Sequence, residues 1–360
     1  MERALSAPGK LFLSGEYAVL WGGAARVLAV GPRTAALVRR RQDTRVQVVL
    51  DEGSLTGRAT PFGVAWEGAV PAGFSFVART LDEALRAHGR EALGLQLAIA
   101  PSATGEGGQK LGMGGSACAT VLAAEGARYV LSERFDALKL ALAAHAAGQG
   151  GKGSGGDVAA SFAGGVLRYR RYDVSALAAA SSTGRYGAAL LAAPPVDLWR
   201  LPEPRVALAY AFTGASASTR VLIAQVEAQL AEAGRQRFVE RSDALGLAVE
   251  EGLAGGDFRA LREAVEAQHA LLLELGPLET EGMRRVLALA GAYGCAGKLS
   301  GAGGGDGCIL FAPTAQAREE LLAGLATRGL HAFALEPEPG VRGEARADPR
   351  LAQWLDAADA

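Results

Sequence analysis

The stretch KLGMGGSA, residues 110–117, joins a glycine-rich loop to a helix pattern over Ser116–Leu131. Glycines let backbone N–H groups converge, and a helix that begins near Ser116 points its positive end at them. This arrangement predicts a cradle for phosphate. Ser116 is expected either to cap the helix or to place its hydroxyl on a phosphate oxygen or on Mg²⁺.

Two further glycine-rich patches accompany predicted elements. GQGGKGSGG (148–156) follows a helix predicted over Arg134–Ala147, and GAGGGDG (301–307) lies between two short predicted strands. Glycine accounts for 49 of the 360 residues, about twice its usual share of about 7%. Because these glycines are bunched and not periodic, they indicate backbone that approaches a ligand or adopts positive φ.

The distribution of lysine supports this interpretation. Arginine dominates the basic residues, and Lys139 lies on an ordinary predicted helix. The other lysines fall within the glycine-rich segments and the start of the chain: Lys10, Lys110, Lys152 and Lys298. A chain that keeps lysine at these places indicates a need for compact positive charges, as at phosphates.

Two common nucleotide-binding patterns do not fit. The P-loop sequence GxxxxGK[ST] is absent. Gly112–Ala117 matches GxGxxA and Gly148–Gly153 matches GxGxxG, but the second follows a helix, and no clear acidic partner follows the first after a second strand. The sequence therefore argues against a P-loop NTPase and against a dinucleotide-binding oxidoreductase.

Composition indicates a globular protein, with 49% apolar and 21% charged residues and a formal net charge of −1. This balance argues against nucleic acid or an anionic membrane as the main partner. No apolar run approaches the ~18 residues of a membrane span, and the start of the chain lacks the apolar stretch of a signal peptide. The three cysteines form no CxxC, so we expect a cytoplasmic enzyme with reduced thiols.

Strands are expected over 10–14, 26–30, 34–40, 46–50 and 95–100, and a helix over 76–87. Because hairpin-like strands open the chain and helices follow, the pattern predicts an α+β fold rather than a doubly wound parallel sheet. The segment Ala176–Pro195 has little periodicity and is interpreted as a join between two domains. The tail after Glu336 is polar and is expected to be loosely held, apart from a short helix around Trp354. We therefore divide the chain into residues 1–175, a connection over 176–200, a second domain over 201–345 and a tail over 346–360.

Three ordered motifs resemble those of the family that groups galactokinase, homoserine kinase, mevalonate kinase and phosphomevalonate kinase, the GHMP kinases. They are APGKLFLSGEYAVL (7–20), KLGMGGSA (110–117) and KLSGAGGGD (298–306). The resemblance spans nearly the whole chain. It implies an N-terminal ATP-binding α/β domain with a left-handed crossover, a C-terminal ferredoxin-like domain and a site in the cleft between them.

Within this family the details are most similar to the phosphomevalonate kinase branch. The segments concerned are Gly15–Tyr17, GSGGDVA (153–159) and FTGASAST (212–219). Gly115 and Phe212 depart from the family, which usually has a serine and a tryptophan there. The resemblance implies transfer of the γ-phosphoryl of Mg-ATP to (R)-5-phosphomevalonate in the mevalonate route to isoprenoids. Another enzyme of the family (mevalonate kinase, diphosphomevalonate decarboxylase or a sugar kinase) and a non-catalytic nucleotide- or sugar-binding relative are the alternatives, and a homodimer is left open.

The resemblance also implies roles for single residues. Lys10 is expected to bridge the donor and acceptor phosphates, and Asp157 to act as a Mg²⁺ partner, an orienter of Lys10 or a base, unless it only caps a helix. The expected nucleotide contacts are Lys110, Gly112, Gly114, Gly115, Ser116 and Ala117, with Ser116 also at the metal. The expected substrate contacts are Lys10, Glu16, Tyr17, Ser154, Gly155, Ser216, Ser218, Thr219, Gly301 and Ala302. Helix N-capping is the alternative for Ser216, Ser218 and Thr219. Asp306 is expected to brace its loop. The four histidines match no motif and are interpreted as structural; they are His88, His145, His269 and His331.

Overall fold

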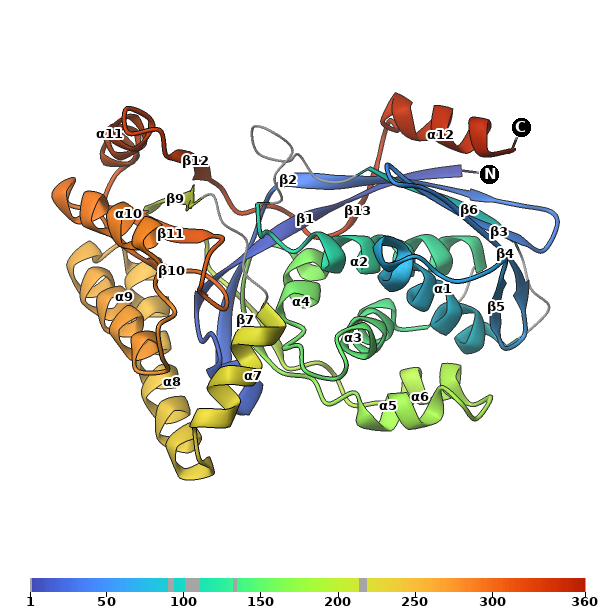
Figure 1. The fold of residues 1–360 in the computed structure, drawn as a ribbon, viewed down its shortest axis with the longest axis horizontal. Helices are drawn as coiled ribbons and strands as arrows, with labels where there is room; N and C mark the ends of the chain where they lie inside the picture. Colours follow the sequence, from blue (N-terminus) through green and yellow to red (C-terminus); the bar gives the residue numbers. More distant parts are fainter. Residues whose placement is uncertain (1, 90–93, 101–110, 132–134, 214–218, 360) are drawn as a thin grey trace.

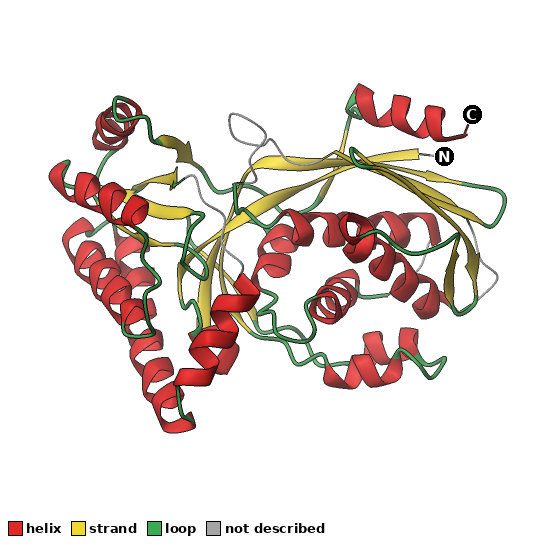
Figure 2. Cartoon of the chain, in the orientation of Figure 1, coloured by secondary structure: helices red, strands yellow, loops and turns green. Residues whose placement is uncertain are grey.

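The computed structural model describes residues 2–89, 94–100, 111–131, 135–213 and 219–359, which form two β-sheets with helices packed on each (Figures 1 and 2). The first sheet contains β1 (Glu2–Ser14), β2 (Ala24–Arg40), β3 (Arg45–Leu50), β4 (Gly53–Thr60), β5 (Gly63–Trp66), β6 (Leu95–Ala100), β7 (Val166–Arg170), β8 (Leu198–Leu201) and β13 (Arg342–Glu344). The second contains β9 (Ala207–Phe212), β10 (Ala296–Leu299), β11 (Gly307–Ala312) and β12 (His331–Leu335). The helices are α1 (Ser75–His88), α2 (Gly115–Leu131), α3 (Ala137–Gly148), α4 (Gly156–Ala163), α5 (Ser175–Ala180), α6 (Tyr186–Ala192), α7 (Thr219–Gln229), α8 (Glu232–Gly255), α9 (Phe258–Leu273), α10 (Glu281–Ala292), α11 (Ala315–Ala326) and α12 (Pro349–Asp359).

The first sheet is covered on both faces. Its strands follow the order β13-β1-β2-β6-β3-β4-β5, with β7 also paired to β2 and β8 to β7. Side chains alternate between faces along a strand, so Leu97 and Ile99 of β6 pack in the core that contains α1 to α4, while Ala98 and Ala100 pack with α12. Figure 1 shows α1 to α4 on one side of this sheet and α12 on the other. The layer of α1 to α4 carries the glycine-rich loops that precede α2 and α4.

The second sheet has the order β10-β11-β9-β12, and every neighbouring pair is antiparallel. In chain order the elements run from β9 through α7 to α10, then β10, β11, α11 and β12. Numbered one to four along the chain, the strands lie side by side as 2-3-1-4, the split β-α-β arrangement of ferredoxin-like folds. The expected α+β class and ferredoxin-like topology are therefore confirmed.

The hairpin of β1 and β2 serves both halves of the molecule. Phe12 and Val27 point into the core of the first helical layer. Leu11 and Leu28 lie on the other face, in a core that also contains Phe311 of the second sheet. This hairpin therefore carries Lys10 along a strand that is packed from both sides.

Several elements differ from the sequence expectation. The separate strands expected over 26–30 and 34–40 form one long strand, β2, and β4, β5, β7 and β8 were not foreseen. The segment expected to be an irregular join contains α5, α6 and β8, and Leu177 and Tyr186 are buried in the first core. The tail is held by α12, whose Leu351 and Leu355 are fully buried against the first sheet. The domain limits and the crossover handedness remain predictions.

Within the part of the chain that the structure describes, no helix has both the length and the apolar character that crossing a membrane requires.

Candidate active site

The glycine loop of the second motif lies against the strand of the first. The backbone N–H of Lys10 donates to the carbonyl of Met113 at 2.9 Å. Gly114 has φ +85°, and a Cβ there would lie 3.3 Å from Cγ of Lys10 and 3.8 Å from Cβ of Asp157. Glycine is required at this turn because of its left-handed backbone. Strand β1, the loop before α2 and the start of α4 thus converge on Gly114.

The first turns of α2 and α4 present a hydroxyl and a carboxylate. The carbonyl of Gly114 accepts the N–H groups of Ala117 and Cys118, so Ser116 lies inside the first turn and is not the cap. Gly155 caps α4, so Asp157 also lies in a first turn, with its Oδ1 accepting the N–H of Val158. The capping roles considered for both residues are therefore excluded.

A histidine lies between these two groups. Nε2 of His145, on α3, is 3.2 Å from Oγ of Ser116 and 3.9 Å from Oδ2 of Asp157. The side chain of His145 is 1% exposed and that of Asp157 is 18% exposed. The sequence interpretation of His145 as purely structural did not place it here. The signal available was its position one turn before the second glycine patch, but our interpretation of these patches rested on their lysines.

Lys10 carries the positive charge of the site. Its Nζ lies 5.2 Å from the ring centroid of Phe12, and the residue is half-buried. An ammonium over an aromatic face is stabilised by the ring. The described structure thus fixes the stem of Lys10 between Gly114 and Phe12.

The third motif packs against the second. Gly112 has φ +71°, and a Cβ there would lie 2.6 Å from Cγ of Asp306. The carbonyl of Asp306 accepts both the N–H and the hydroxyl of Thr213 at 2.8 and 3.0 Å. Tyr210 of β9 donates its hydroxyl to the carbonyl of Leu111 at 3.1 Å. The second sheet therefore supports the glycine loop before α2 directly, while the expected bracing of its own loop by Asp306 stays a prediction.

Two of the expected substrate contacts are engaged by the protein itself. Glu16 is buried and accepts a hydrogen bond from Nζ of the fully buried Lys298. Tyr17 is buried and donates its hydroxyl to the carbonyl of Ala302 at 2.7 Å. Burial and the neighbouring carboxylate raise the pKa of Tyr17 well above its usual value. These contacts favour a bracing role, in which Glu16, Tyr17, Lys298 and Ala302 tie the first motif to the third.

The other expected substrate positions differ in accessibility. Ser154 is half-buried, and its hydroxyl accepts the N–H of Gly156 at 3.2 Å. Gly155 has φ +78°, and a Cβ there would lie 2.7 Å from the hydroxyl of Tyr169. Where the structure describes the chain, no atom lies within 4 Å of the position that a Cβ of Gly301 would take. Lys110, Ser216, Ser218 and the side chain of Thr219 lie outside the described residues.

The arrangement fits a nucleotide phosphate with a divalent cation. A Cβ at Gly115 would meet no atom of the described residues within 4 Å, and Gly115 begins α2, whose N-terminal N–H groups favour anions. Among the described residues no cluster of three or more His, Cys, Asp or Glu could hold a metal alone. Mg²⁺ is commonly held by one or two protein oxygens together with phosphates and water. Ser116 and Asp157 supply such oxygens.

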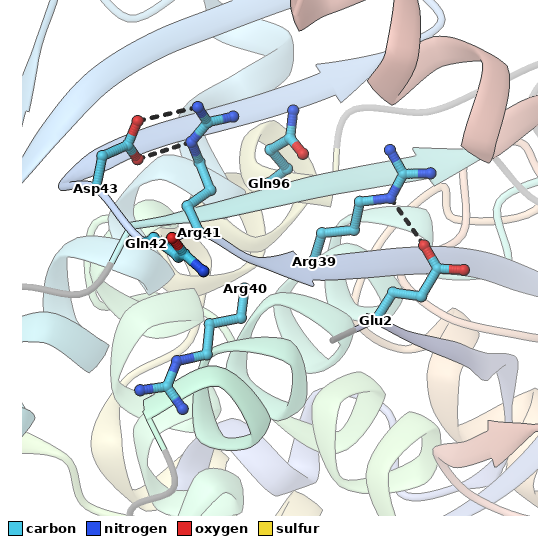
Figure 3. A pocket seen from close by; sticks show the side chains of 7 residues that line it. All are labelled: Glu2, Arg39, Arg40, Arg41, Gln42, Asp43 and Gln96. Atoms are coloured by element: carbon cyan, nitrogen blue, oxygen red, sulfur yellow. Dashed lines mark hydrogen bonds and ion pairs between the residues drawn. The ribbon is translucent and has the colours of Figure 1, made fainter.

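A separate depression of about 660 Å³ lies on the first sheet, and no residue of the three motifs lines it (Figure 3). Two of the arginines that line it form ion pairs with acidic residues. Arg39 pairs with Glu2 and Arg41 with Asp43. This surface therefore plays no part in the site described here.

Comparisons with known proteins agree with the geometry. A profile of the C-terminal domain of GHMP kinases matches residues 249–330. A phosphomevalonate kinase of Streptomyces sp. (strain CL190) is 31% identical over 331 residues, which cover 83% of this chain and 87% of that protein.

Solved structures share the fold. A protein of Listeria innocua has a TM-score of 0.86 at 24% identity, over 96% of this chain and 100% of that one. Streptococcus pneumoniae phosphomevalonate kinase, in complex with phosphomevalonate and AMPPNP, has a TM-score of 0.78 at 22% identity, over 93% and 99%. Motifs, fold and relatives thus lead to one conclusion: the chain belongs to the GHMP kinase family, and it is similar to the phosphomevalonate kinases of that family along most of its length.

Proposed function

We propose that this enzyme transfers the γ-phosphoryl group of Mg-ATP to the phosphate of (R)-5-phosphomevalonate, giving 5-diphosphomevalonate and ADP in the mevalonate route to isoprenoids. The observation that carries the proposal is the convergence of Lys10, Ser116 and Asp157 on the glycine loop at the start of α2. The similarity to the Streptomyces phosphomevalonate kinase supports the choice of acceptor.

Binding of the nucleotide rests on the loop and on two side chains. The first turn of α2 offers N–H groups to the phosphates, and Gly115 leaves room beside them. Ser116 and Asp157 would hold Mg²⁺, which when bound neutralises charge on the phosphates. Lys110 is a further nucleotide contact in this proposal, together with Gly112, Gly114 and Ala117.

The chemical work of the protein is to bring two anions together. A loose phosphoryl-transfer transition state needs positioning and charge stabilisation more than covalent help. The side chains of Lys10 and Asp157 both lie close to Gly114. The ammonium of Lys10 can therefore bind between the donor and acceptor phosphates. Ser154, Gly155 and Gly301 are assigned to the acceptor side, with Ser216, Ser218 and Thr219 from the segment after Thr213.

Asp157 need not remove a proton in this reaction. A phosphomonoester has a second pKa of about 6, so most of the acceptor is already a dianion at neutral pH. Asp157 is therefore assigned to holding Mg²⁺ and orienting Lys10. A hydroxyl acceptor, as in a sugar or mevalonate kinase, would instead require a base at this position.

Release of ADP with a panel of acceptors tests the proposal. The panel contains mevalonate, phosphomevalonate, diphosphomevalonate, homoserine and galactose. We expect the highest kcat/KM with phosphomevalonate. A preference for mevalonate, or CO₂ release from diphosphomevalonate, would assign the site to another enzyme of the family, and nucleotide binding without any turnover would indicate a non-catalytic relative.

We further propose that the enzyme acts in the cytoplasm on this small substrate, with no nucleic-acid or membrane partner. The thiols of Cys118, Cys295 and Cys308 are free and buried, which suits a reducing compartment. A homodimer remains a prediction, which sedimentation velocity would test.

A further inference from the structure

His145 is the buried group that links the two oxygens assigned to the metal-bound nucleotide. Its Nε2 faces Oγ of Ser116 at 3.2 Å and Oδ2 of Asp157 at 3.9 Å. These three residues come from the last turn of α3 and from the first turns of α2 and α4. The ring therefore lies where three helices meet.

The surroundings hold the ring in one orientation. It packs on Phe76 of α1 with 4.9 Å between centroids and an interplanar angle of 31°. Gly148 allows this approach, since a Cβ there would lie 2.7 Å from the ring of Phe76. Nδ1 of His145 is buried and has no hydrogen-bond partner among the residues described.

The surroundings of the two ring nitrogens indicate which of them donates a hydrogen bond. A neutral imidazole carries one N–H, and a buried N–H without an acceptor is more rarely tolerated than an acceptor without a donor. An N–H on Nε2 can therefore be donated to Ser116 and attracted by Asp157. Ser116 then accepts this hydrogen bond and keeps its own O–H and a second lone pair for groups outside the protein.

We propose that His145 is a positioning residue, which fixes the hydroxyl of Ser116 beside the carboxylate of Asp157 so that both oxygens face the metal-bound phosphates together. The inference rests on the proposed function, because it takes Ser116 and Asp157 as the groups that hold Mg²⁺ and nucleotide. Through these two contacts, His145 joins the first turns of α2 and α4.

The test measures the affinity for ADP by titration calorimetry, once with MgCl₂ and once with EDTA. His145→Leu keeps the packing on Phe76 and removes the donor. We expect the gain in affinity that Mg²⁺ provides to fall about 10–100-fold, as for other groups that orient a metal ligand, while the affinity in EDTA stays unchanged. His145→Gln places an amide N–H near the position of Nε2 and should restore most of the gain.

A double-mutant cycle with Ser116→Ala separates positioning from general packing. If His145 acts through Ser116, adding His145→Leu to Ser116→Ala should lower the Mg²⁺-dependent gain in ADP affinity little further. His269→Leu is the matched control, since His269 is a half-buried histidine bonded to Glu279 at 3.1 Å in the other half of the molecule. This control should leave the Mg²⁺-dependent gain intact. All variants are checked for folding by circular dichroism.

Each outcome decides the inference. Three results would overturn it. The two single variants could show additive losses of ADP affinity, or His145→Leu could lose as much affinity in EDTA as in MgCl₂. His145→Gln could also bind ADP as weakly in MgCl₂ as His145→Leu. If His145→Leu does not fold, His145→Asn replaces it, because its amide lies near Nδ1 and leaves Ser116 without a donor. A wild-type protein with no Mg²⁺-dependent ADP binding would refute the proposed function as well. Preference for another acceptor, with the cycle as expected, would refute the acceptor alone.

Discussion

Lys10 and Asp157 both lie close to Gly114, and their charges have different tasks in the proposed reaction. We expect Lys10→Met to lower kcat about 10²–10³-fold, as for loss of a group that stabilises transition-state charge. Asp157→Asn keeps the shape and removes the negative charge, and should cost about 10–100-fold because it acts through Mg²⁺ and Lys10. Steady-state kinetics on phosphomevalonate at neutral pH compares the two.

The pH–rate profile distinguishes a positioning Asp157 from a base. Because the acceptor phosphate is already ionised at neutral pH, the Asp157→Asn variant should remain below wild type by a constant factor as pH rises. A steep recovery of this variant at high pH would show that Asp157 removes a proton. Circular dichroism confirms that both variants are folded.

At the residue scale, the motifs singled out residues that the structure brings together, and the chemical roles of these residues stay predictions. The motifs led to Lys10, Ser116 and Asp157 because charged and hydroxyl side chains beside glycine loops have few other purposes. His145 escaped because its relation to Ser116 depends on how α2 and α3 pack. For Glu16, likewise, the motif did not reveal the contact with Lys298.

At the scale of the loop before α2, two adjacent glycines have opposite requirements. Gly114 has φ +85° and close neighbours, whereas Gly115 begins the helix and a Cβ there would meet no described residue within 4 Å. Gly114→Ala should lower the free energy of unfolding by about 1–2 kcal/mol from its left-handed backbone alone, and should also weaken activity by pushing on Lys10. Gly115→Ser, which introduces the usual family residue, should leave stability nearly unchanged. Urea unfolding of both variants provides the measurement; equal losses would contradict the assigned backbone requirement.

The elements that the sequence predicted share strong periodicity. The helix pattern of residues 76–87 and the strand at 95–100 were found within a residue or two at each end. The strand β4 was missed because its sequence GSLTGRAT contains few apolar residues. α5 and α6 were missed because small residues dominate them, and what holds them is packing of Leu177 and Tyr186 on the first core. Tertiary contact outweighed local pattern there.

At the scale of the whole molecule, the buried pair of Glu16 and Lys298 joins the first motif to the second sheet. Removing one partner of such a pair leaves an uncompensated buried charge and typically costs about 3–5 kcal/mol. We therefore expect Lys298→Met to lower the free energy of unfolding by this amount, and the double variant Glu16→Gln/Lys298→Met to recover part of it. Chemical denaturation with both variants tests this, and a single variant as stable as wild type would contradict it.

The polar C-terminal segment also contributes to the whole. Leu351 and Leu355 of α12 are 0% exposed, and Gln47 of β3 donates to the carbonyl of Ala358 at 2.7 Å. Each buried leucine contributes about 1.5–3 kcal/mol, an upper estimate. Ending the chain before Pro349 should therefore destabilise the protein by several kcal/mol and expose Leu37 and Val49. Thermal unfolding of the truncated chain is the measurement, and an unchanged Tm would show that the tail is loose.

The hairpin of β1 and β2 has a thermodynamic consequence. Phe12 and Val27 belong to one core, and Leu11 and Leu28 belong to the other. Unfolding of either half would therefore expose one apolar face of this hairpin and destabilise the other half. The molecule should therefore absorb heat in one cooperative transition, with the calorimetric enthalpy equal to the van't Hoff enthalpy. For the same reason, residues 201–345 expressed alone would lack the β1 and β2 side chains that complete their core, and they should not fold stably.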